Sequence, residues 1–463
     1  GGLLLRQVLT VPAAKQRCAA LPDCKGFSFK GADAGTPMVI FFKSKQDLHK
    51  SGSEKWTSLI MKEKAVPFDC DAALANFEAA WSPEKKDWCC QNAGKGCAPR
   101  STQAKRVIKS ISYNPVPLKT RGSMLENDFM SPGTSAMWGP GCRRDLSIIA
   151  ALGANNVRTY GNNVANDHSS FLADAHRNGL QVIAGISEWP YTKMPGSCQT
   201  TRFNCFRQIN AHYGANLRNG FAATGNYHPA LRMVVLINEP DSTLAGGREE
   251  AWLLAIITAF DGVLEAEQQA GIVGPVPDMT VAFSLVMGMH KMQQLRDAMQ
   301  DPSTLGYTPR HQLWGPYQKR WVNSINAANH TAEFVLSYVK GYEDMFPDMP
   351  LFISEYHADE GNQEDDVRQL LRASEGAESP LLGISFFEFQ MRYDLGGDMA
   401  SFGLFGLGDT RVGQVDLGEK EYSAWCITPQ ADVHSGELLA QAVTAAYGGR
   451  GVDLMNLCSD ACP

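Results

Sequence analysis

Two glutamates occupy positions suited to acid–base and nucleophilic chemistry. Glu239 and Glu355 lie 116 positions apart, and each follows a short apolar run, residues 232–237 and 350–353. Such runs are typical of buried strands, and the carboxyl ends of the strands of a parallel barrel form the mouth where its catalytic residues gather. Two carboxyl groups there can cleave a glycosidic bond, one by protonating the leaving oxygen and the other by attacking the sugar. The pair therefore predicts an enzyme that acts on glycosides.

Further side chains at the ends of neighbouring strands are expected to bind the sugar. Arg158 could keep a carboxylate ionised by pairing with it, and Asn238 could hold a sugar hydroxyl. Glu388 is a rival carboxylate, and the two-residue period of a strand would point Gln390 the same way. The tyrosines are expected as aromatic platforms for sugar rings. The predicted substrate-binding residues are Tyr113, Arg158, Tyr160, Asn238, Tyr317, Tyr356, Glu388 and Gln390.

The elements that would position these residues alternate between strands and helices from about residue 107 onward. This alternation is typical of βα units, and eight strands over about 300 residues favour a (β/α)8 TIM barrel of class α/β. A doubly wound open sheet is the alternative, but no Gly-x-Gly-x-x-Gly follows the first strand. Helices are expected at 143–152, 169–178, 249–269 and 332–346. The predicted strands are 107–113, 156–160, 181–187, 232–238, 279–285, 312–317, 350–355 and 382–389.

Length, charge and hydropathy leave room for accessory parts. The chain has 463 residues, of which 44% are hydrophobic, enough for a barrel and roughly 150 further residues. No apolar run approaches the ~20 residues of a transmembrane helix, and residues 1–5 could be the remnant of a processed leader. Residues 1–106 hold 17 Lys and Arg against 10 Asp and Glu, whereas the remainder holds 25 against 39. A basic front could dock to an acidic matrix or could simply be a solvated surface. Nothing resembles a nucleic-acid-binding motif.

The twelve cysteines fall into local groups. Even local counts favour disulfides and an oxidising compartment, so a secreted or cell-surface protein is expected. Zinc could compete for the second group, but two adjacent cysteines and the absence of His from residues 66–100 disfavour a tetrahedral site. The single Cys142 is predicted to pair with a C-terminal cysteine. The groups are Cys18 and Cys24; Cys70, Cys89, Cys90 and Cys97; Cys198 and Cys205; and Cys426, Cys458 and Cys462.

Other polar motifs are interpreted more simply. His168 and His357 lack the spacing of metal ligands. The acidic residues 359–366 lack the EF-hand pattern, so this segment is expected to be the solvated start of a helix. No metal or cofactor is predicted. Asn329-His330-Thr331 is a glycosylation sequon and predicts a glycoprotein.

Four segments are expected: 1–64, 65–104, 105–420 and 421–463. The stretch from Cys18 to Ser28 resembles an apple/PAN adhesion module, a family that typically binds protein or carbohydrate. The second segment is too small to bury a core without cross-links, and a spacer or a surface-binding knob is expected. The last segment, with Trp425-Cys426-Ile427 and Cys458, is similar to a shortened family 43 glucan-binding module.

The third segment resembles clan A of the glycoside hydrolases, in which glutamates end strands 4 and 7. Within that clan it is most similar to family 72, the β-1,3-glucanosyltransferases, followed by the family 17 glucanases. The residues that carry this resemblance are Ile111–Pro115, Cys142–Leu146, Leu152–Tyr160, Ser354–Tyr356, Phe386–Gln390 and Phe402–Leu404.

This resemblance implies a retaining enzyme acting on β-glucan, most of all β-1,3-glucan, in a cell wall or extracellular matrix. Glu239 would be the acid/base and Glu355 the nucleophile, with Arg158 facing the latter. Retention requires carboxyl groups about 5–5.5 Å apart. The accessory segments would dock the enzyme to the matrix.

The sequence also departs from family 72. Asn238-Glu239-Pro240 is more typical of family 5 cellulases and mannanases, and His357 replaces a common glycine. An endo-β-1,4-glucanase or mannanase is therefore one alternative. A non-catalytic glucan-binding structural protein is the other.

Overall fold

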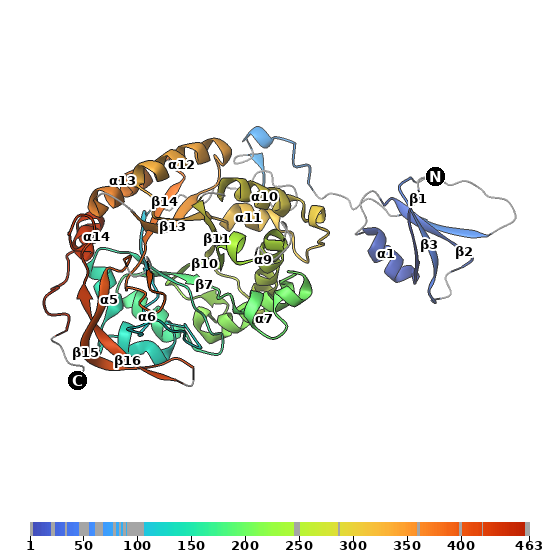
Figure 1. Cartoon of the computed structure of the whole chain (residues 1–463). Coiled ribbons are helices and arrows are strands. Elements are labelled where there is room, and N and C mark those ends of the chain that lie inside the picture. Colours follow the sequence, from blue (N-terminus) through green and yellow to red (C-terminus); the bar gives the residue numbers. More distant parts are fainter. Residues whose placement is uncertain are drawn as a thin grey trace. The chain divides into compact units, whose positions relative to one another are not determined.

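The computed structural model divides the chain into two compact units, residues 1–85 and 86–463 (Figure 1). Each unit has its own sheet and its own apolar core. The residues that the structure describes are 3–19, 24–32, 35–45, 55–60, 68–76, 80–82, 85–86, 89, 106–244, 251–285, 288–358, 362–397, 401–418 and 420–458.

The first unit is a four-stranded antiparallel sheet in the order β1-β3-β2-β4. Its elements are β1 (Leu3–Leu9), α1 (Val11–Ala19), β2 (Gly26–Lys30), β3 (Met38–Lys43) and β4 (Trp56–Ile60). Alternate residues of a strand face opposite sides, so Phe27, Phe29, Ile40 and Phe42 meet Val11 of α1 in one core. A disulfide between Cys18 and Cys24 joins the end of the helix to β2. The apple/PAN resemblance stays a prediction.

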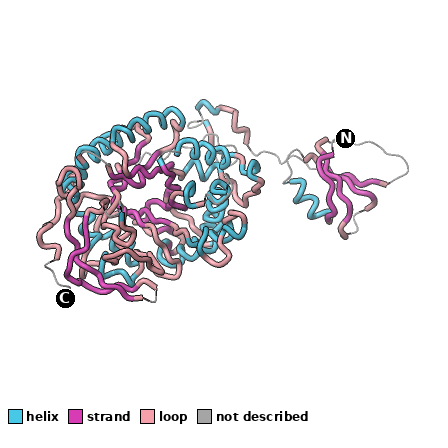
Figure 2. The backbone as a smooth tube through the Cα atoms, in the orientation of Figure 1, coloured by secondary structure: helices cyan, strands magenta, loops and turns pink. Residues whose placement is uncertain are grey.

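The second unit contains a closed barrel of eight parallel strands with helices around it (Figures 1 and 2). The predicted (β/α)8 fold is confirmed. Seven of the predicted strands overlap a barrel strand. In order around the barrel the strands are β5 (Ile108–Tyr113), β6 (Asn156–Thr159), β7 (Gln181–Gly185), β10 (Leu231–Asn238), β11 (Asp278–Ser284), β12 (Asn323–Ala328), β13 (Leu351–His357) and β14 (Leu381–Phe386).

The prediction for the sixth strand was wrong. Residues 312–317 run into helix α11 (Trp314–Arg320), and the strand follows as β12. Pro316 lies in the first turn of α11, where a missing N–H costs nothing because those N–H groups have no partner within the helix. Two aromatic residues of this segment stack along the helix, with the ring centroids of Trp314 and Tyr317 5.6 Å apart.

The barrel helices lie close to their predicted places, and a small two-stranded sheet of β8 (Ala222–Ala223) and β9 (Asn226–Tyr227) lies beside them. Among the described residues, none of the helices combines the length and the apolar character needed to cross a membrane. The helices are α4 (Ser135–Trp138), α5 (Asp145–Ala151), α6 (Ser169–Arg177), α7 (Phe206–Asn216), α8 (Pro240–Thr243), α9 (Ala251–Gln269), α10 (Gly288–Gln300), α11, α12 (Ala332–Met345), α13 (Gln363–Glu375) and α14 (Leu439–Tyr447).

Two apolar clusters hold the barrel together. The larger one lies between the strands and the helices. The smaller one fills the barrel interior near the amino ends of the strands, and we call it the barrel floor. Towards the carboxyl ends of the strands, the buried residues include polar side chains such as Arg158, Asn326 and Glu355. The barrel floor consists of Ile108, Ile183, Met233, Val235, Val322 and Phe352.

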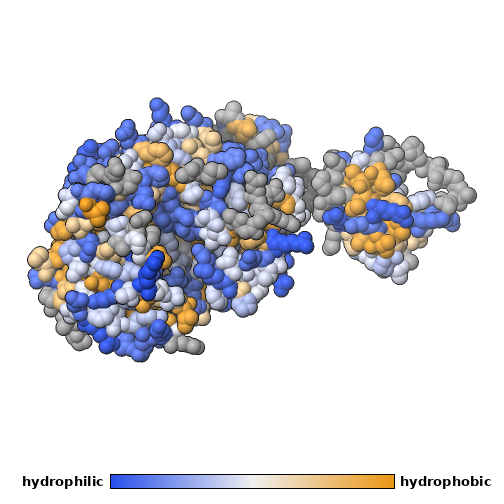
Figure 3. All heavy atoms as spheres, in the orientation of Figure 1, coloured by the Kyte–Doolittle hydropathy of each residue, from blue (hydrophilic) through white to orange (hydrophobic). Residues whose placement is uncertain are grey.

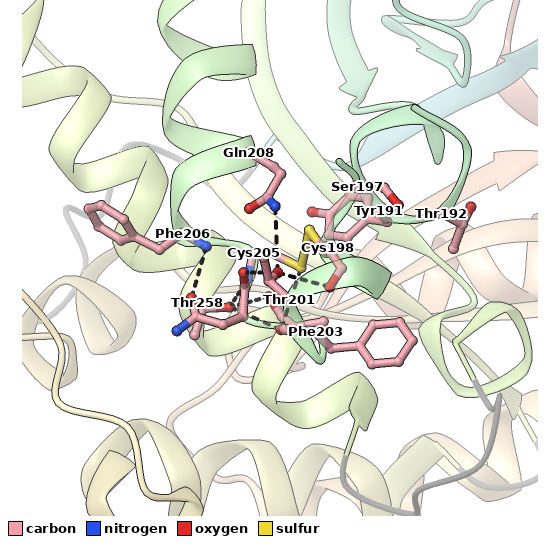
Figure 4. Close-up of a disulfide and its surroundings, with 12 residues drawn as sticks. Tyr191, Thr192, Ser197, Cys198, Thr201, Phe203, Cys205, Phe206, Gln208 and Thr258 are labelled. Carbon is pink, nitrogen blue, oxygen red and sulfur yellow. Dashed lines mark hydrogen bonds between the residues drawn. A yellow bond between two sulfur atoms is a disulfide. The ribbon is translucent and has the colours of Figure 1, made fainter. Parts of the chain in front are cut away.

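A disulfide fixes the loop that follows β7 at the carboxyl end of the barrel. Cys198 and Cys205 are joined just before α7 begins (Figure 4). The backbone N–H of Cys205 donates to the Thr258 hydroxyl on α9 at 2.8 Å, and the Gln208 side chain donates to the Gly196 carbonyl at 2.9 Å. The loop is thereby held to two helices.

A long hairpin follows the barrel, formed by β15 (Phe405–Asp416) and β16 (Glu421–Pro429). A disulfide joins Cys426 to Cys458, and a side chain at Gly408 would bring its Cβ within 2.6 Å of both sulfur atoms. The predicted boundary between residues 420 and 421 falls in the turn of this hairpin. The division into four segments stays a prediction.

Cys142 also forms a disulfide, and the cysteine that it pairs with lies outside the described residues. Because Cys426 and Cys458 pair with each other, Cys462 is the C-terminal cysteine to which the predicted bond would go. A Cβ at Gly413, in β15, would lie 3.7 Å from the Cys142 sulfur. Cys142 therefore faces the C-terminal hairpin.

Candidate active site

Two barrel strands each place a glutamate side chain at the carboxyl end of the barrel. Glu239 directly follows β10 and Glu355 lies in β13, the fourth and seventh strands counted from β5. In the pairing of β12 with β13, Ile325 opposes Ile353 but Asn326 opposes Glu355, so Ser354 is an extra residue. Such a bulge re-aims side chains and is common beside active sites.

Glu355 is held by Arg158 of β6 and by Tyr160. Nη1 of Arg158 donates to Glu355 Oε1 at 2.8 Å and to the Ser354 carbonyl at 2.6 Å. The Tyr160 hydroxyl donates to the same Oε1 at 2.9 Å. Within the described part of the chain, no hydrogen bond engages Oε2 of Glu355. One carboxylate oxygen is therefore fixed and the other is available.

Glu239 is held from β12 and from its own turn. Its Oε1 accepts from Nδ2 of Asn326 at 2.9 Å, and Ser242 donates to Oε2 at 3.4 Å. The Glu239 backbone is left-handed, with φ 46° and ψ 57°. This conformation is uncommon for a residue with a side chain and often marks functional sites.

The two carboxyl groups belong to one hydrogen-bonded network. Asn238 Oδ1 accepts from Arg158 Nη2 at 2.7 Å and from Asn326 Nδ2 at 3.2 Å. The Ser354 hydroxyl donates to Asn326 Oδ1 at 2.8 Å, which fixes the orientation of that amide. Residues from β6, β10, β12 and β13 thus converge above the barrel floor.

Burial and charge set the protonation of this network. Burial raises the pKa of Glu355, and the negative charge of Glu239 raises it further, whereas the adjacent Arg158 guanidinium opposes both. Burial of its hydroxyl raises the pKa of Tyr160 well above the usual value. Tyr160 therefore keeps its proton and acts as a donor to Glu355.

Glu388 is a third carboxyl group near this network. It follows β14, is 0% exposed, and neither carboxyl oxygen has a hydrogen-bond partner in the described structure. Burial raises its pKa well above the usual value; Arg392 opposes this shift, while Glu355 and Asp394 add to it. Arg392 is itself engaged by Asp394, through two bonds of 2.8 and 2.7 Å. Glu388 is therefore expected to be a neutral carboxylic acid at neutral pH.

Replacing Glu388 by glutamine is expected to stabilise the protein at neutral and alkaline pH. The pKa of this carboxyl group is higher in the folded state than in the unfolded state, where it is about 4.3. The protein therefore loses stability as the pH rises from that value through the folded pKa. Glutamine cannot ionise. Urea unfolding of both proteins between pH 4 and 9 should give curves that coincide at acid pH and separate above it. A constant difference across this range would contradict the neutral state of Glu388.

Six of the ten predicted site residues gather at this end of the barrel. Tyr113 and Gln390 are not part of the network. The Tyr113 hydroxyl donates to Asp145 Oδ2 at 2.8 Å. Gln390 accepts from Arg143 at 2.9 Å and donates to the Val116 carbonyl at 2.7 Å. Both side chains are 0% exposed. Strand alternation did not apply to Gln390 because β14 ends at Phe386.

Tyr317 and Tyr356 also lie away from the network. Tyr317 is buried in α11 rather than at a strand end, which corrects the prediction built on the misplaced strand. Tyr356 follows Glu355 and points to the other side of β13, where its hydroxyl donates to Asp366 of α13 at 2.8 Å. The aromatic group that the network does contain is Tyr160.

Asn326 and Ser354 were not predicted. Asn326 was missed because its strand was misplaced, although Ser324 and Asn326 alternate with the apolar Ile325 and Ala327 in the way a strand does. Ser354 was missed because strict alternation with Glu355 would have sent it outward. A register shift of one residue is not visible in the sequence.

The motifs that were set aside have structural roles. His168 lies 2.9 Å from Asp128 and His357 lies 2.8 Å from the Phe387 carbonyl. Burial lowers the pKa of His357 to about 4. Residues 359–361 lie outside the described residues, and the acidic residues after them form the first turn of α13. In the described ranges, no group of three or more His, Cys, Asp or Glu is placed to hold a metal ion.

No protein-family profile matches the sequence, and no curated protein matches it significantly. The chain is similar to solved structures that include Saccharomyces cerevisiae Gas2p in complex with laminaripentaose, at 12% identity over 79% of this chain and 71% of that chain, with a TM-score of 0.43. Another is ScGas2 in complex with compound 8, at 13% identity over 79% of this chain and 70% of that one, with a TM-score of 0.45. At these values the similarity carries no argument about activity.

Proposed function

We propose that this protein is a retaining glycoside hydrolase or transglycosylase. The observation that carries the proposal is the single network in which Arg158 and Asn326 hold Glu355 and Glu239 at the carboxyl end of the barrel. An acid and a nucleophile that flank one bond are what glycoside cleavage requires. A surface ion pair would not need four barrel strands to position it.

In the proposed mechanism, Oε2 of Glu355 attacks the anomeric carbon. Glu239 donates a proton to the glycosidic oxygen as the bond to the leaving sugar breaks, which yields a glycosyl ester on Glu355. Glu239, now ionised, then takes a proton from water or from an acceptor hydroxyl, and that oxygen displaces Glu355 from the sugar. Hydrolysis and transfer differ only in this acceptor.

Arg158 and Tyr160 prepare Glu355 for attack. Their bonds to Oε1 favour the ionised carboxylate against the cost of its burial. The same bonds fix the direction of Oε2 before the sugar arrives, which lowers the entropy cost of reaching the transition state. Tyr160 would also line the position of the sugar ring, and Asn238 would offer a hydrogen bond to one of its hydroxyls.

β-1,3-Glucan is the substrate to test first, because the motif around Glu355 and the segment Leu152–Tyr160 resemble those of β-1,3-glucan-active enzymes. We further propose that the protein acts outside the cell, in a wall or matrix. The disulfides of the described cysteines are typical of that environment. The N-terminal unit and the C-terminal hairpin are proposed to help it dock there.

The anomeric form of the first product tests this function. With laminarin as substrate, proton NMR during the first minutes should detect the β-anomer, because two displacements restore the original configuration. The carboxyl groups of a retaining pair lie about 5–5.5 Å apart, too close to admit a water between them. Products from cellulose and mannan, analysed for linkage in parallel, identify the preferred glycan.

Two results would overturn the proposal. An α-anomeric first product would establish inversion. Absence of turnover on all three glycans, with glycan binding preserved, would favour the non-catalytic alternative. A 2-deoxy-2-fluoro glucosyl reagent followed by peptide mass analysis provides an independent measurement, with the label expected on Glu355.

A further inference from the structure

Among the described residues of the N-terminal unit, one side of the sheet is covered and the other is not. α1 packs against the side that contains Phe27 and Phe42. The alternate residues face the other side, and their register places Arg6 beside Phe41 and Phe41 beside Ser28. We call this side the open face and define it by Arg6, Val8, Phe41, Lys43, Trp56 and Ile60.

The open face exposes large apolar side chains. Val8 is 64% exposed, Trp56 41% and Ile60 45%. Hydrophobic and hydrophilic residues lie side by side on this unit in Figure 3. Clusters of exposed apolar residues with polar neighbours are typical of binding surfaces, whereas single ones are not.

Positive charges lie among the aromatic rings of the open face. The Arg6 guanidinium lies 5.5 Å from the centre of the Phe41 ring and the Lys43 ammonium 5.9 Å from it. Trp56 meets the same ring edge-on at 5.5 Å. The four strands contain no Asp or Glu. Aromatic groups and cations are thus grouped without a neighbouring acidic residue on these strands.

We infer that the open face binds an acidic polysaccharide. A pyranose ring has an apolar C–H side that can pack on Trp56 and Phe41, while its carboxylate or sulfate groups can pair with Arg6 and Lys43. Arginine suits such anions because its planar guanidinium can donate two parallel hydrogen bonds.

The charge distribution of the whole chain favours an acidic ligand over a neutral one. Residues 107–463 hold 25 Lys and Arg against 39 Asp and Glu, so an acidic polymer repels the catalytic part. The basic N-terminal region attracts it. Binding through the open face would therefore hold the enzyme in an acidic matrix while its barrel acts on a different, uncharged glycan. The inference rests on the docking role proposed above for the N-terminal unit and names its ligand, but the binding itself is measured independently of the proposed activity.

Binding of the full chain to alginate and polygalacturonate tests the inference. Co-sedimentation at 50 mM and 500 mM NaCl should detect binding that weakens with salt, because exposed charge pairs are screened. The double variant Arg6→Glu/Lys43→Glu should bind about tenfold or more weakly at low salt. Trp56→Ala should weaken binding at both salt concentrations, since stacking is not screened.

A matched control is available on the opposite side of the unit. Lys15 and Arg17 lie on α1 and are exposed, so Lys15→Glu/Arg17→Glu changes the net charge by the same amount. This variant should keep most of the binding, and circular dichroism should confirm that each variant is folded. Equal losses in both double variants would reduce the effect to net charge and overturn the inference.

Other occupants give different outcomes, each of which contradicts the inference. Vesicles containing phosphatidylserine would bind in place of the polysaccharides if the open face were a membrane surface. Sedimentation of the protein alone would detect a dimer, lost in Trp56→Ala, if a second copy covered it. Salt-independent binding of laminarin at the same face would indicate a neutral glycan.

Discussion

Replacing Glu355 by glutamine is expected to abolish turnover of every glycan substrate, by about 10³-fold or more, because no other group can form the glycosyl ester. Glutamine retains the size of the side chain and can still accept a hydrogen bond from Arg158 or Tyr160. The folded structure should therefore persist. Initial rates on laminarin and on an aryl glycoside, with thermal unfolding alongside, would measure both effects.

Glu239→Ala provides the matched control for this loss. The variant lacks the proton donor, so it should lose about 10²–10⁴-fold on glucan but much less on an aryl glycoside whose leaving group needs no proton. Azide should then restore part of the rate by attacking the glycosyl ester, giving a retained β-glycosyl azide. The retained azide product in the Glu355 variant instead would mean that the two roles are exchanged.

Replacing Arg158 by leucine is expected to give the largest loss of stability at the site, about 3–5 kcal/mol at neutral pH. The Arg158 side chain is 1% exposed and that of Glu355 is 11% exposed, so removal of one charge leaves the other buried without its partner. Without Arg158 the pKa of Glu355 rises further. The loss should therefore be small at acid pH, where Glu355 is protonated, and should grow as the pH rises. Urea unfolding at several pH values would measure it.

Two controls separate this effect from simple loss of packing. Arg158→Leu combined with Glu355→Gln should recover most of the stability at neutral pH, because no buried charge remains. Lys193→Leu removes one member of an exposed pair, in which the side chains are 62% and 40% exposed, and should cost no more than about 1 kcal/mol. If the double variant were as unstable as Arg158→Leu alone, the charge of Glu355 would not be the cause.

The sequence predicted those parts of the barrel that depend on local pattern. Apolar runs such as residues 232–237 form strands because a strand covered on both sides needs apolar residues at every position. The two glutamates come at the ends of such runs, so they lie at the carboxyl end of the barrel. Arg158 could be placed because it lies in a short strand that the pattern marked clearly.

What remained hidden depends on contacts between distant segments. The register shift that inserts Ser354 beside Glu355 arises from pairing with a strand about thirty residues away. Tyr113 ends its strand as predicted, yet Asp145 draws its hydroxyl away from the site. The segment 312–317 has strand-like composition, but its proline suits the first turn of a helix equally well. In the first two cases the partner decides, and the partner is remote in sequence.

The barrel floor has a kinetic consequence if the proposed chemistry is correct. Ile108, Met233, Val322 and Phe352 close the interior below the site, so reactants and products have to share the opening at the carboxyl end. After the first displacement, the departing glycan leaves towards the same end from which a water molecule or a second glycan would approach the glycosyl ester. The rate at which the departing glycan leaves, compared with the rate at which water or a second glycan arrives, would then determine the ratio of hydrolysis to transfer.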